Sequence, residues 1–306
     1  MEDWGGICYA LSAFEAAGPP GWELFPVVKV GRDVREEASE LFAGLDRIGA
    51  TDGVRWVDEP NNRVELEYHG PERRTERLSG GVPGWSWGEL APLASSCDAL
   101  YVNFIAGWEL DLEVARELRS AVEGPVYADL HSLFLGVEPD GTRVPRELED
   151  GTEWVSCFDL VQMNEDELRR LVGDGREDAG DPWRAAGRLT AATGTRALFV
   201  TRGARGARWI PRDPDLSGLL PAGGEAGGGT AGSDARFGEE PAPAVDDPDP
   251  TGCGDVWGIT CFGALLAGSG VRDAVRRANR VAARNARHRG GRALARPNEG
   301  GGTRES

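Results

Sequence analysis

The stretch DPDPTGCGDVWGITCFGALLAG, residues 247–268, decides the fold of this chain. It begins with prolines and acidic residues, passes through Gly252, Cys253 and Gly254, and continues as an apolar sequence of helical length. The first N–H groups of a helix have no intrahelical acceptor, and small residues let a ligand approach the backbone closely. The positive end of the helix dipole favours an anion at the same place. The stretch therefore predicts a helix whose N-terminus can hold a negatively charged group.

Asp255 stands in the first turn of this predicted helix, where its carboxylate would repel a bound phosphate. We infer that it contacts a substrate hydroxyl. The arrangement suits phosphoryl transfer, in which a base orients the attacking hydroxyl while backbone amides stabilise charge on the transferred group. An isolated Gly-x-Gly-Asp sequence is more commonly a turn with a capping aspartate, so the rest of the chain must decide between the two interpretations.

Composition excludes several classes of protein. With 306 residues, 40% of them apolar, the chain can form a sizeable core. Its formal net charge of -17 argues against nonspecific binding to nucleic acid, whose phosphates attract basic surfaces. It contains no membrane-length apolar run and no basic, signal-like start, so we expect no membrane association and a cytoplasmic location. The five cysteines lack C-x-x-C spacing, and Lys29, the only lysine, does not stand in a Walker-type loop.

Apolar segments of strand length alternate with amphipathic helical segments along most of the chain. The predicted strands are residues 25–31, 97–107, 125–133, 158–164 and 196–203. The predicted helices between and around them are residues 33–48, 111–124, 165–173 and 182–194. This alternation is typical of an α/β protein with a mostly parallel sheet covered by helices on both faces.

Two regions interrupt the alternation. Residues 54–80 contain three short segments with alternating polar and apolar residues, which predict an antiparallel β lid with one solvated face. Residues 211–247 are dense in Gly, Ala, Pro and acidic residues, and we expect a flexible surface insertion there. We interpret residues 1–306 as a single domain that carries both features.

The sequence DPTGCGDVWG, residues 249–258, resembles the C-terminal signature of the ribokinase-like (PfkB) family of carbohydrate and nucleoside kinases, D-T-x-G-A-G-D followed by a helix. Three further segments resemble family elements in the same order. Residues 5–33 resemble its glycine pair, helix, strand and VGxD element, VQMNEDEL (161–168) its N-x-x-E segment, and VTRGARGA (200–207) its nucleotide-side VTxGxxG. The resemblance covers nearly the whole chain and implies a three-layer α/β/α fold with a small antiparallel lid.

The resemblance implies a role for each matching residue. Asp255 would be the catalytic base that accepts the proton of the substrate hydroxyl, and the helix N-terminus would be the anion hole. The cofactors would be ATP and Mg²⁺, with K⁺ as a monovalent cation in some family members. The implied residues are Gly252, Cys253 and Gly254 for the anion hole; Asn164 and Glu167 to support magnesium; Thr201, Gly203, Gly206 and Asn279 for ATP; Asp249 and Thr251 for the monovalent cation; and Gly5 and Gly6 for the substrate. Asp129 is a further substrate candidate for another reason: it follows a predicted strand whose carboxyl end should face the ligand crevice, and a solvated loop residue is the alternative.

The chain also departs from the family pattern. The family normally begins with a strand carrying a substrate-binding aspartate before the glycine pair, whereas Gly5 and Gly6 almost start this sequence. We expect a start upstream of Met1, and the alternative is a product without that strand. The asparagine that usually follows the glycine pair is absent, with Tyr9 and Ala10 in its region, so the sequence does not identify the acceptor.

The leading hypothesis is an ATP-dependent kinase that phosphorylates a sugar, nucleoside or related small molecule. Its partners would be ATP and that small hydroxylated substrate, and the lid could pair two subunits in a homodimer. A non-catalytic homologue that binds a nucleotide or sugar is the alternative. An NAD-dependent dehydrogenase is disfavoured because no G-x-G-x-x-G follows an early strand.

Overall fold

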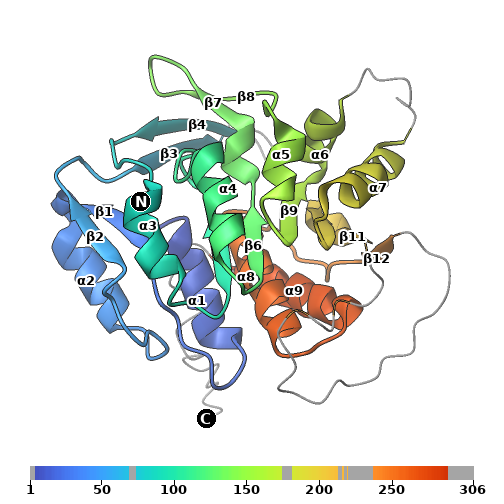
Figure 1. Cartoon of the computed structure of the whole chain (residues 1–306), viewed down its shortest axis with the longest axis horizontal. Coiled ribbons are helices and arrows are strands. Elements are labelled where there is room, and N and C mark those ends of the chain that lie inside the picture. The colour runs from blue at the N-terminus through green and yellow to red at the C-terminus, as the bar shows by residue number, and fades with distance from the viewer. Residues whose placement is uncertain are drawn as a thin grey trace, which may run out of the picture.

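A six-stranded sheet forms the centre of the protein (Figure 1). The computed structural model describes residues 4–68, 74–173, 181–212, 216, 219 and 237–288. In spatial order the strands are β12 (Gly238–Glu240), β11 (Ala207–Pro211), β10 (Ala197–Thr201), β9 (Leu160–Asn164), β6 (Val126–Asp129) and β5 (Leu100–Asn103). β5, β6, β9 and β10 are parallel, while β11 and β12 are antiparallel to their neighbours. The predicted α/β class with a mostly parallel sheet is confirmed.

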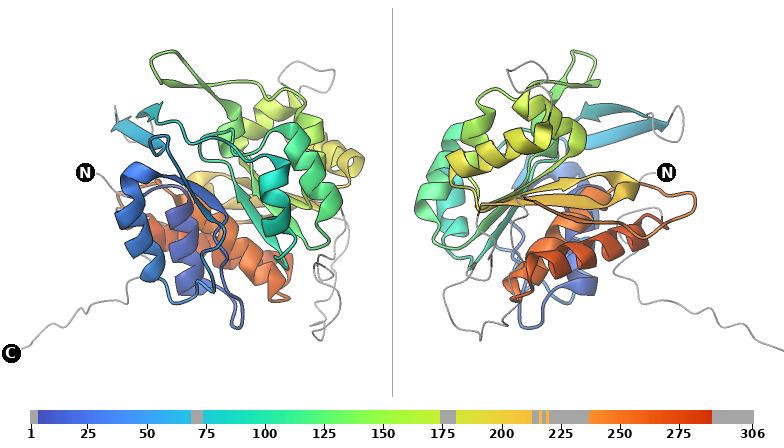
Figure 2. Two further views of the ribbon diagram at one scale, coloured as in Figure 1. Left: turned by 60° about the vertical axis from the view of Figure 1, so that its left-hand side comes forward. Right: turned by 90° about the vertical axis from the view of Figure 1, so that its right-hand side faces the viewer.

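Helices cover both faces of this sheet, as the two views of Figure 2 show. One face carries α3 (Trp87–Ala94), α4 (Leu112–Ala121), α5 (Gly151–Ser156), α6 (Glu165–Val172) and α7 (Pro182–Thr193), and the other carries α1 (Ile7–Ala17), α8 (Cys253–Leu266) and α9 (Val271–Asn285). Each face has its own apolar core. Phe104, Leu118 and Phe158 belong to the first, and Tyr127, Phe199 and Phe262 belong to the second. The three layers follow from strands whose two faces are both apolar.

The register of the parallel strands aligns polar residues at their carboxyl ends. Asn103 of β5 pairs with Asp129 of β6, and Asp129 pairs with Gln162 of β9. Residues in register across parallel strands point to the same face of the sheet. These three side chains therefore form a row directed at the face that carries α8.

A second, two-stranded sheet corrects the predicted lid. Val54–Val57 forms β2, which pairs in parallel with β1 (Val28–Gly31) and not with the following strands. The antiparallel hairpin contains only β3 (Arg63–Tyr68) and β4 (Arg74–Ser79). Alternation predicts a strand with one wet face but not its partner, which explains the error for residues 54–57. Between β1 and α3 lies α2 (Arg35–Ala43), shorter than the predicted helix 33–48 because Gly44 follows it.

The hairpin continues into another short sheet. β7 (Leu135–Val137) and β8 (Arg143–Pro145) are antiparallel, and Leu78 N–H of β4 donates to Gly141 O in the turn between them at 2.8 Å. An isolated bridge also pairs Arg77 with Thr142. The lid is thus joined to the body of the protein through its second strand.

The expected insertion at residues 211–247 is also corrected in part. Gly238–Glu240 forms the edge strand β12 of the central sheet, and Leu216 and Leu219 are buried. Residues 213–215, 217–218 and 220–236 lie outside the described residues.

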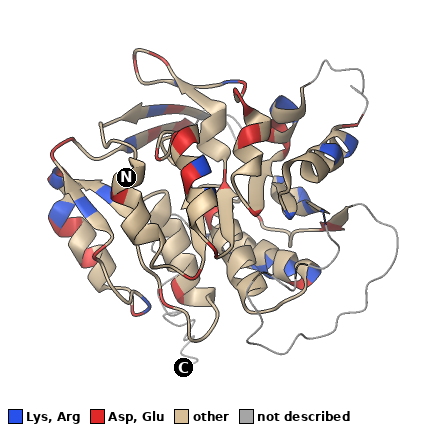
Figure 3. Ribbon diagram, viewed as in Figure 1, with Lys and Arg blue, Asp and Glu red and all other residues tan. Residues whose placement is uncertain are grey.

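In the view of Figure 3, acidic and basic residues are interspersed on the peripheral helices. None of the helices in the described part of the chain is long and apolar enough to cross a membrane.

Candidate active site

A cavity of about 2280 Å³ extends along the carboxyl ends of the parallel strands. Its walls come from the sheet, α1, the N-terminus of α8, and the lid strands β3 and β4. It is lined by polar side chains from several elements, among them Asn103, Asp129, His131, Asn164, Glu167 and Asp255. Ligands of open α/β sheets bind at this edge, because the loops that leave the strands diverge there.

Two glycines stand at the N-terminus of α8, Gly252 and Gly254, and the structure requires glycine at the first position but not at the second. Gly252 precedes the helix at φ 71°, and a Cβ at this position would lie 2.3 Å from the Tyr9 ring. The fold itself therefore requires glycine at 252. Around Gly254 the nearest atoms to such a Cβ would be 3.7 Å away, on Asp129 and Gln162. Packing therefore does not require glycine at 254. Because Gly254 has no side chain, however, its backbone is open to the cavity.

The three residues of the predicted anion hole are not equivalent. The N–H of Cys253 donates to Pro250 O at 3.1 Å, so the turn already uses it. The Cys253 thiol is directed to main-chain oxygens of Asp249 and Ala282, and burial raises its pKa. Within the described part of the chain, no backbone carbonyl accepts from the N–H of Gly254. The same is true of the N–H of Gly252, so among the described residues only the Cys253 member is already used, and the N–H groups of Gly252 and Gly254 are available to an anion.

Asp255 presents its carboxylate to the cavity and is held from the sheet. Asn103 Nδ2 donates to Asp255 Oδ1 at 2.6 Å, and the Tyr101 hydroxyl lies 3.4 Å from the main-chain oxygen of Asp255. Burial raises the pKa of Asp255 to about 6, and the hydrogen bond from Asn103 opposes this shift. A carboxyl group with a pKa just below neutrality can accept a proton from a hydroxyl and release it again.

Asp129, predicted to contact the substrate, is buried with 4% of its surface exposed, and so is not a solvated loop residue. Its Oδ1 accepts from the His131 N–H at 3.1 Å, and its Oδ2 accepts from Gln162 Nε2 at 2.7 Å. Burial raises its pKa to about 7. Gln162 also donates to Gly254 O at 3.0 Å, so Asp129 holds the side chain that anchors α8.

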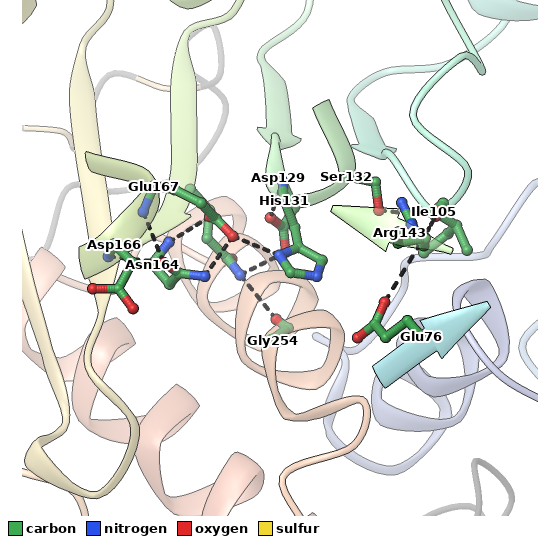
Figure 4. Close-up of polar contacts among 11 residues, drawn as sticks. Glu76, Ile105, Asp129, His131, Ser132, Arg143, Asn164, Asp166, Glu167 and Gly254 are labelled. Carbon is green, nitrogen blue, oxygen red and sulfur yellow. Dashed lines mark hydrogen bonds and ion pairs between the residues drawn. The ribbon is translucent and has the colours of Figure 1, made fainter. Parts of the chain in front are cut away.

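The predicted N-x-x-E pair forms the N-terminal cap of α6 (Figure 4). Asn164 Oδ1 accepts from the N–H groups of Asp166 and Glu167, both at 2.9 Å, and Glu167 Oε2 accepts from the Asn164 N–H at 2.7 Å. Glu167 Oε1 is shared by Asn164 Nδ2 and by His131 Nδ1, the latter at 2.5 Å. Burial disfavours the charged form of His131, but the Glu167 carboxylate raises its pKa to about 9.

These contacts decide which metal roles the residues can have. Because protein donors occupy both Glu167 oxygens, the pair suits magnesium held through water and donor phosphates better than direct ligation. The described residues contain no cluster of three His, Cys, Asp or Glu side chains placed to bind a metal. In the predicted monovalent-cation loop, Asp249 Oδ1 accepts from the Thr251 N–H and Thr251 O accepts from Asn285 Nδ2, and the cation role of this loop stays a prediction.

On the predicted nucleotide side, Thr201 ends β10 in register with Asn164, and Gly203 begins the 3₁₀ turn Gly203–Arg205. Gly206 has φ 83°, and a Cβ there would lie 2.1 Å from Glu240 O. The close approach of residues 240–242 therefore requires this glycine.

Asn279, predicted to contact ATP, is 3% exposed. It accepts from Trp257 Nε1 at 2.7 Å and donates to Glu240 O and Pro241 O. Its polar atoms therefore join α9 to α8 and to the end of β12. The cavity is also lined by small or apolar side chains from the end of α9 and from the segment after β12, namely Ala242, Val245, Ala282, Ala283 and Ala286.

The glycine pair precedes α1 at the edge of the cavity. Gly5 and Gly6 both line it, and Gly6 precedes α1 at φ 52°. A Cβ on Gly6 would lie 3.0 Å from the Ile105 side chain. Glycine at position 6 therefore lets α1 begin close to the loop that follows β5, whereas a Cβ on Gly5 would meet no atom within 4 Å.

The lid reaches the same loop through an ion pair that the sequence did not indicate. Arg143 of β8 donates to Ile105 O at 2.9 Å and lies 3.9 Å from Glu76 of β4 (Figure 4). Ser132 Oγ also donates to Ile105 O, at 2.8 Å. This loop is thus held by the lid sheet and by the residues after β6.

Sequence reasoning missed Asn103 and Gln162, which connect the sheet to the catalytic candidate. A signal was present: each is a polar residue within an otherwise apolar strand sequence, LYVN and LVQMN. Gly258 was a second sequence signal, in this case for a close contact between α8 and side chains of the sheet. A Cβ there would lie 2.4 Å from both Gln162 Oε1 and the Tyr101 hydroxyl, so α8 has a glycine where these side chains meet it.

Residues 142–298, which contain β9, the capping pair of α6 and the α8 motif, match the PfkB family of carbohydrate kinases. The chain belongs to the PfkB family. The family membership predicted from the motifs is thereby confirmed. The match covers the half of the chain that contains the two most specific motifs, N-x-x-E and the sequence at the start of α8. A search of curated proteins found no match.

Solved structures of ribokinase-family proteins share the fold. A pyrophosphate-dependent kinase in this family is similar with a TM-score of 0.67 and 19% identity, over 94% of this chain and 88% of that one. Ribokinase from Thermotoga maritima gives 0.67 and 18%, over 94% and 82%. Arabidopsis thaliana ribokinase, complexed with ribose and ATP, gives 0.65 and 16%, over 92% and 81%. At these identities the likeness establishes the ribokinase-like fold of this PfkB protein.

Proposed function

We propose that this PfkB protein transfers the γ-phosphoryl group of ATP to a hydroxyl group of a sugar, nucleoside or related small molecule. One observation supports this most strongly. Asp255, with a pKa raised toward neutrality, adjoins Gly254, whose N–H has no backbone acceptor among the described residues, at a helix N-terminus that lines a large cavity. A proton acceptor beside an anion-binding backbone is what in-line phosphoryl transfer needs.

In the proposed reaction the acceptor hydroxyl lies against Asp255 while the transferred phosphoryl group lies at the N-terminus of α8. Asp255 accepts the hydroxyl proton as the new P–O bond forms and the bond to ADP breaks. The N–H of Gly254 and the helix dipole stabilise the charge on the phosphoryl oxygens. Mg²⁺, supported through water by Asn164 and Glu167, would neutralise charge on the donor phosphates.

The alanine and valine side chains at residues 242, 245, 282, 283 and 286 support a nucleotide as the donor. They suit the flat face of a base, and they line the same cavity as the N-terminus of α8. Pyrophosphate is the donor named for one of the similar structures. Parallel assays with ATP and pyrophosphate decide between them, and we expect turnover with ATP. Turnover with pyrophosphate alone would contradict the nucleotide assignment.

The experiment that tests the proposed function is ADP release with a panel of sugars and nucleosides. We compare the wild type with Asp255→Asn, and Asp273→Asn serves as the matched control because Asp273 is an exposed carboxylate on α9. We expect acceptor-dependent ADP release that Asp255→Asn abolishes and Asp273→Asn retains. ATP binding without turnover for every acceptor would favour the non-catalytic alternative.

A further inference from the structure

Asn103 occupies a particular place in the fold. It is the last residue of β5, at the carboxyl edge of the sheet, and it follows Tyr101 by two positions, so both side chains point to the face of α8. It lines the cavity and is partly buried. Its neighbours in the register row are Asp129 and then Gln162.

The contact between Asn103 and Asp255 has a defined direction. A carboxylate only accepts hydrogen bonds, so the amide must donate through Nδ2, and the 2.6 Å distance to Asp255 Oδ1 is that of a short, charge-assisted bond. One of the two carboxylate oxygens is thereby held by the sheet.

The backbone beneath this carboxylate is held as well. Gln162 Nε2 donates to Gly254 O at 3.0 Å, and the Tyr101 hydroxyl lies 3.4 Å from Asp255 O. Tyr127 in turn donates to Gln162 Oε1 at 2.8 Å, which fixes the glutamine. With the first turn of α8 anchored in this way, rotation of the Asp255 carboxylate is the remaining freedom, and Asn103 restricts it.

We infer that Asn103 is a positioning residue of the reaction: it holds Asp255 Oδ1 so that Oδ2 is directed to the acceptor hydroxyl. This inference rests on the proposed role of Asp255 as base. It adds a residue from the opposite half of the chain to the site.

Several ionisable groups face Asp255 and set the background for a pH experiment. They are Tyr101 on β5, Asp129 on β6, His131 after β6 and Cys253 on α8. Burial raises the pKa of Asp255, while Asn103 and then His131 lower it. Removing the Asn103 donor therefore raises this pKa further. Because the base acts when deprotonated, the acidic limb of kcat/KM must move to higher pH.

The test compares Asn103→Leu, which removes the donor at similar size, with Asn103→Asp, which places a second carboxylate against Asp255. Hydrogen bonds to charged groups are strong enough that we expect kcat to fall about tenfold to hundredfold in Asn103→Leu, with little change in the KM for ATP. We expect a larger fall in Asn103→Asp, and an acidic limb at higher pH in both. Tyr101→Phe removes a contact to the Asp255 main-chain oxygen but no donor to its carboxylate, and we expect a smaller shift of the limb than in Asn103→Leu.

A second readout does not depend on activity. The Asp255 carboxyl pKa is measured by carbon-13 NMR on aspartate-labelled protein, assigned with Asp255→Asn, and unfolding curves verify that each variant is folded. An unchanged Asp255 pKa in folded Asn103→Leu, or wild-type kcat and pH profile, would overturn the inference. If Asp255→Asn keeps full activity, the proposed function itself fails, which is a distinguishable result.

Discussion

At the residue scale, two glycines of the α8 region, Gly252 and Gly258, stand where a single added Cβ atom would clash with neighbouring side chains. Gly252 was predictable from the motif, and its positive φ and the nearby Tyr9 ring explain it. Gly258 carries no motif, yet Tyr101 and Gln162 both meet the helix there. The sequence singled out Asp255 because a carboxylate beside an anion hole is chemically unusual, and its role as base stays a prediction. Asn103 had only a weak signal, a polar residue in an otherwise apolar strand, because the register of β5 is what brings it to α8.

Substitution of Gly258 by alanine tests this close packing. The new Cβ would lie 2.4 Å from the Tyr101 hydroxyl and Gln162 Oε1, so both must move. We expect the free energy of unfolding to fall by about 1–3 kcal/mol, as for other overpacked sites. Gly187→Ala in α7 is the control, since no atom lies within 4 Å there. It should instead stabilise the protein slightly, because alanine favours a helix interior. Urea unfolding measures both, and equal effects would contradict the packing argument.

The pH dependence of the wild type follows from Asp255. Burial raises its pKa to about 6, and the proposed base is active only when deprotonated. We therefore expect kcat/KM to fall as the pH decreases through about 6, with no such loss above neutrality from this group. A pH profile of initial rates measures it. A rate that stays constant from neutrality down to pH about 5 would contradict the assignment.

At the element scale, the sequence predicted helices and buried strands well and their partners poorly. Periodicity reports which face of a segment is buried, and this was sufficient for β5, β6, β9 and β10. It does not report the neighbour, so β2 was assigned to the lid and β12 to a surface insertion. The capping pair of α6 illustrates the same limit, because Asn164 and Glu167 satisfy both a helix cap and a kinase motif.

Two variants of Asn164 separate these roles. Asn164→Ala removes the cap, so we expect the free energy of unfolding to fall by about 1 kcal/mol. Asn164→Ser keeps a capping oxygen and should recover that stability, but it loses the amide that donates to Glu167. If the amide orients Glu167 toward the waters of magnesium, Asn164→Ser remains impaired in activity and needs more Mg²⁺. If Asn164→Ser recovers both stability and activity in full, Asn164 acts only as a helix cap and the proposed role in magnesium binding is contradicted.

At the scale of the whole molecule, one cavity joins parts of the chain that are distant in sequence. It is lined by the glycine pair that precedes α1, by the lid, by the carboxyl ends of the strands and by the N-terminus of α8. The family and the three-layer fold could be predicted from ordered motifs, since these span most of the chain. The lid side of the cavity could not be predicted, because the contact of Arg143 with Glu76 and with Ile105 depends on how the lid packs on the rest of the protein.

The central claim is that Asp255 acts as the base in phosphoryl transfer from ATP to a hydroxyl group. The most direct measurement follows the phosphorus-31 NMR signal of the ATP γ-phosphoryl group as it becomes a phosphomonoester of the acceptor. We predict that the wild type forms this ester at a rate about 10²–10⁴-fold above that of Asp255→Asn, the range typical of a general base. Formation of the ester at the wild-type rate by folded Asp255→Asn would contradict the account.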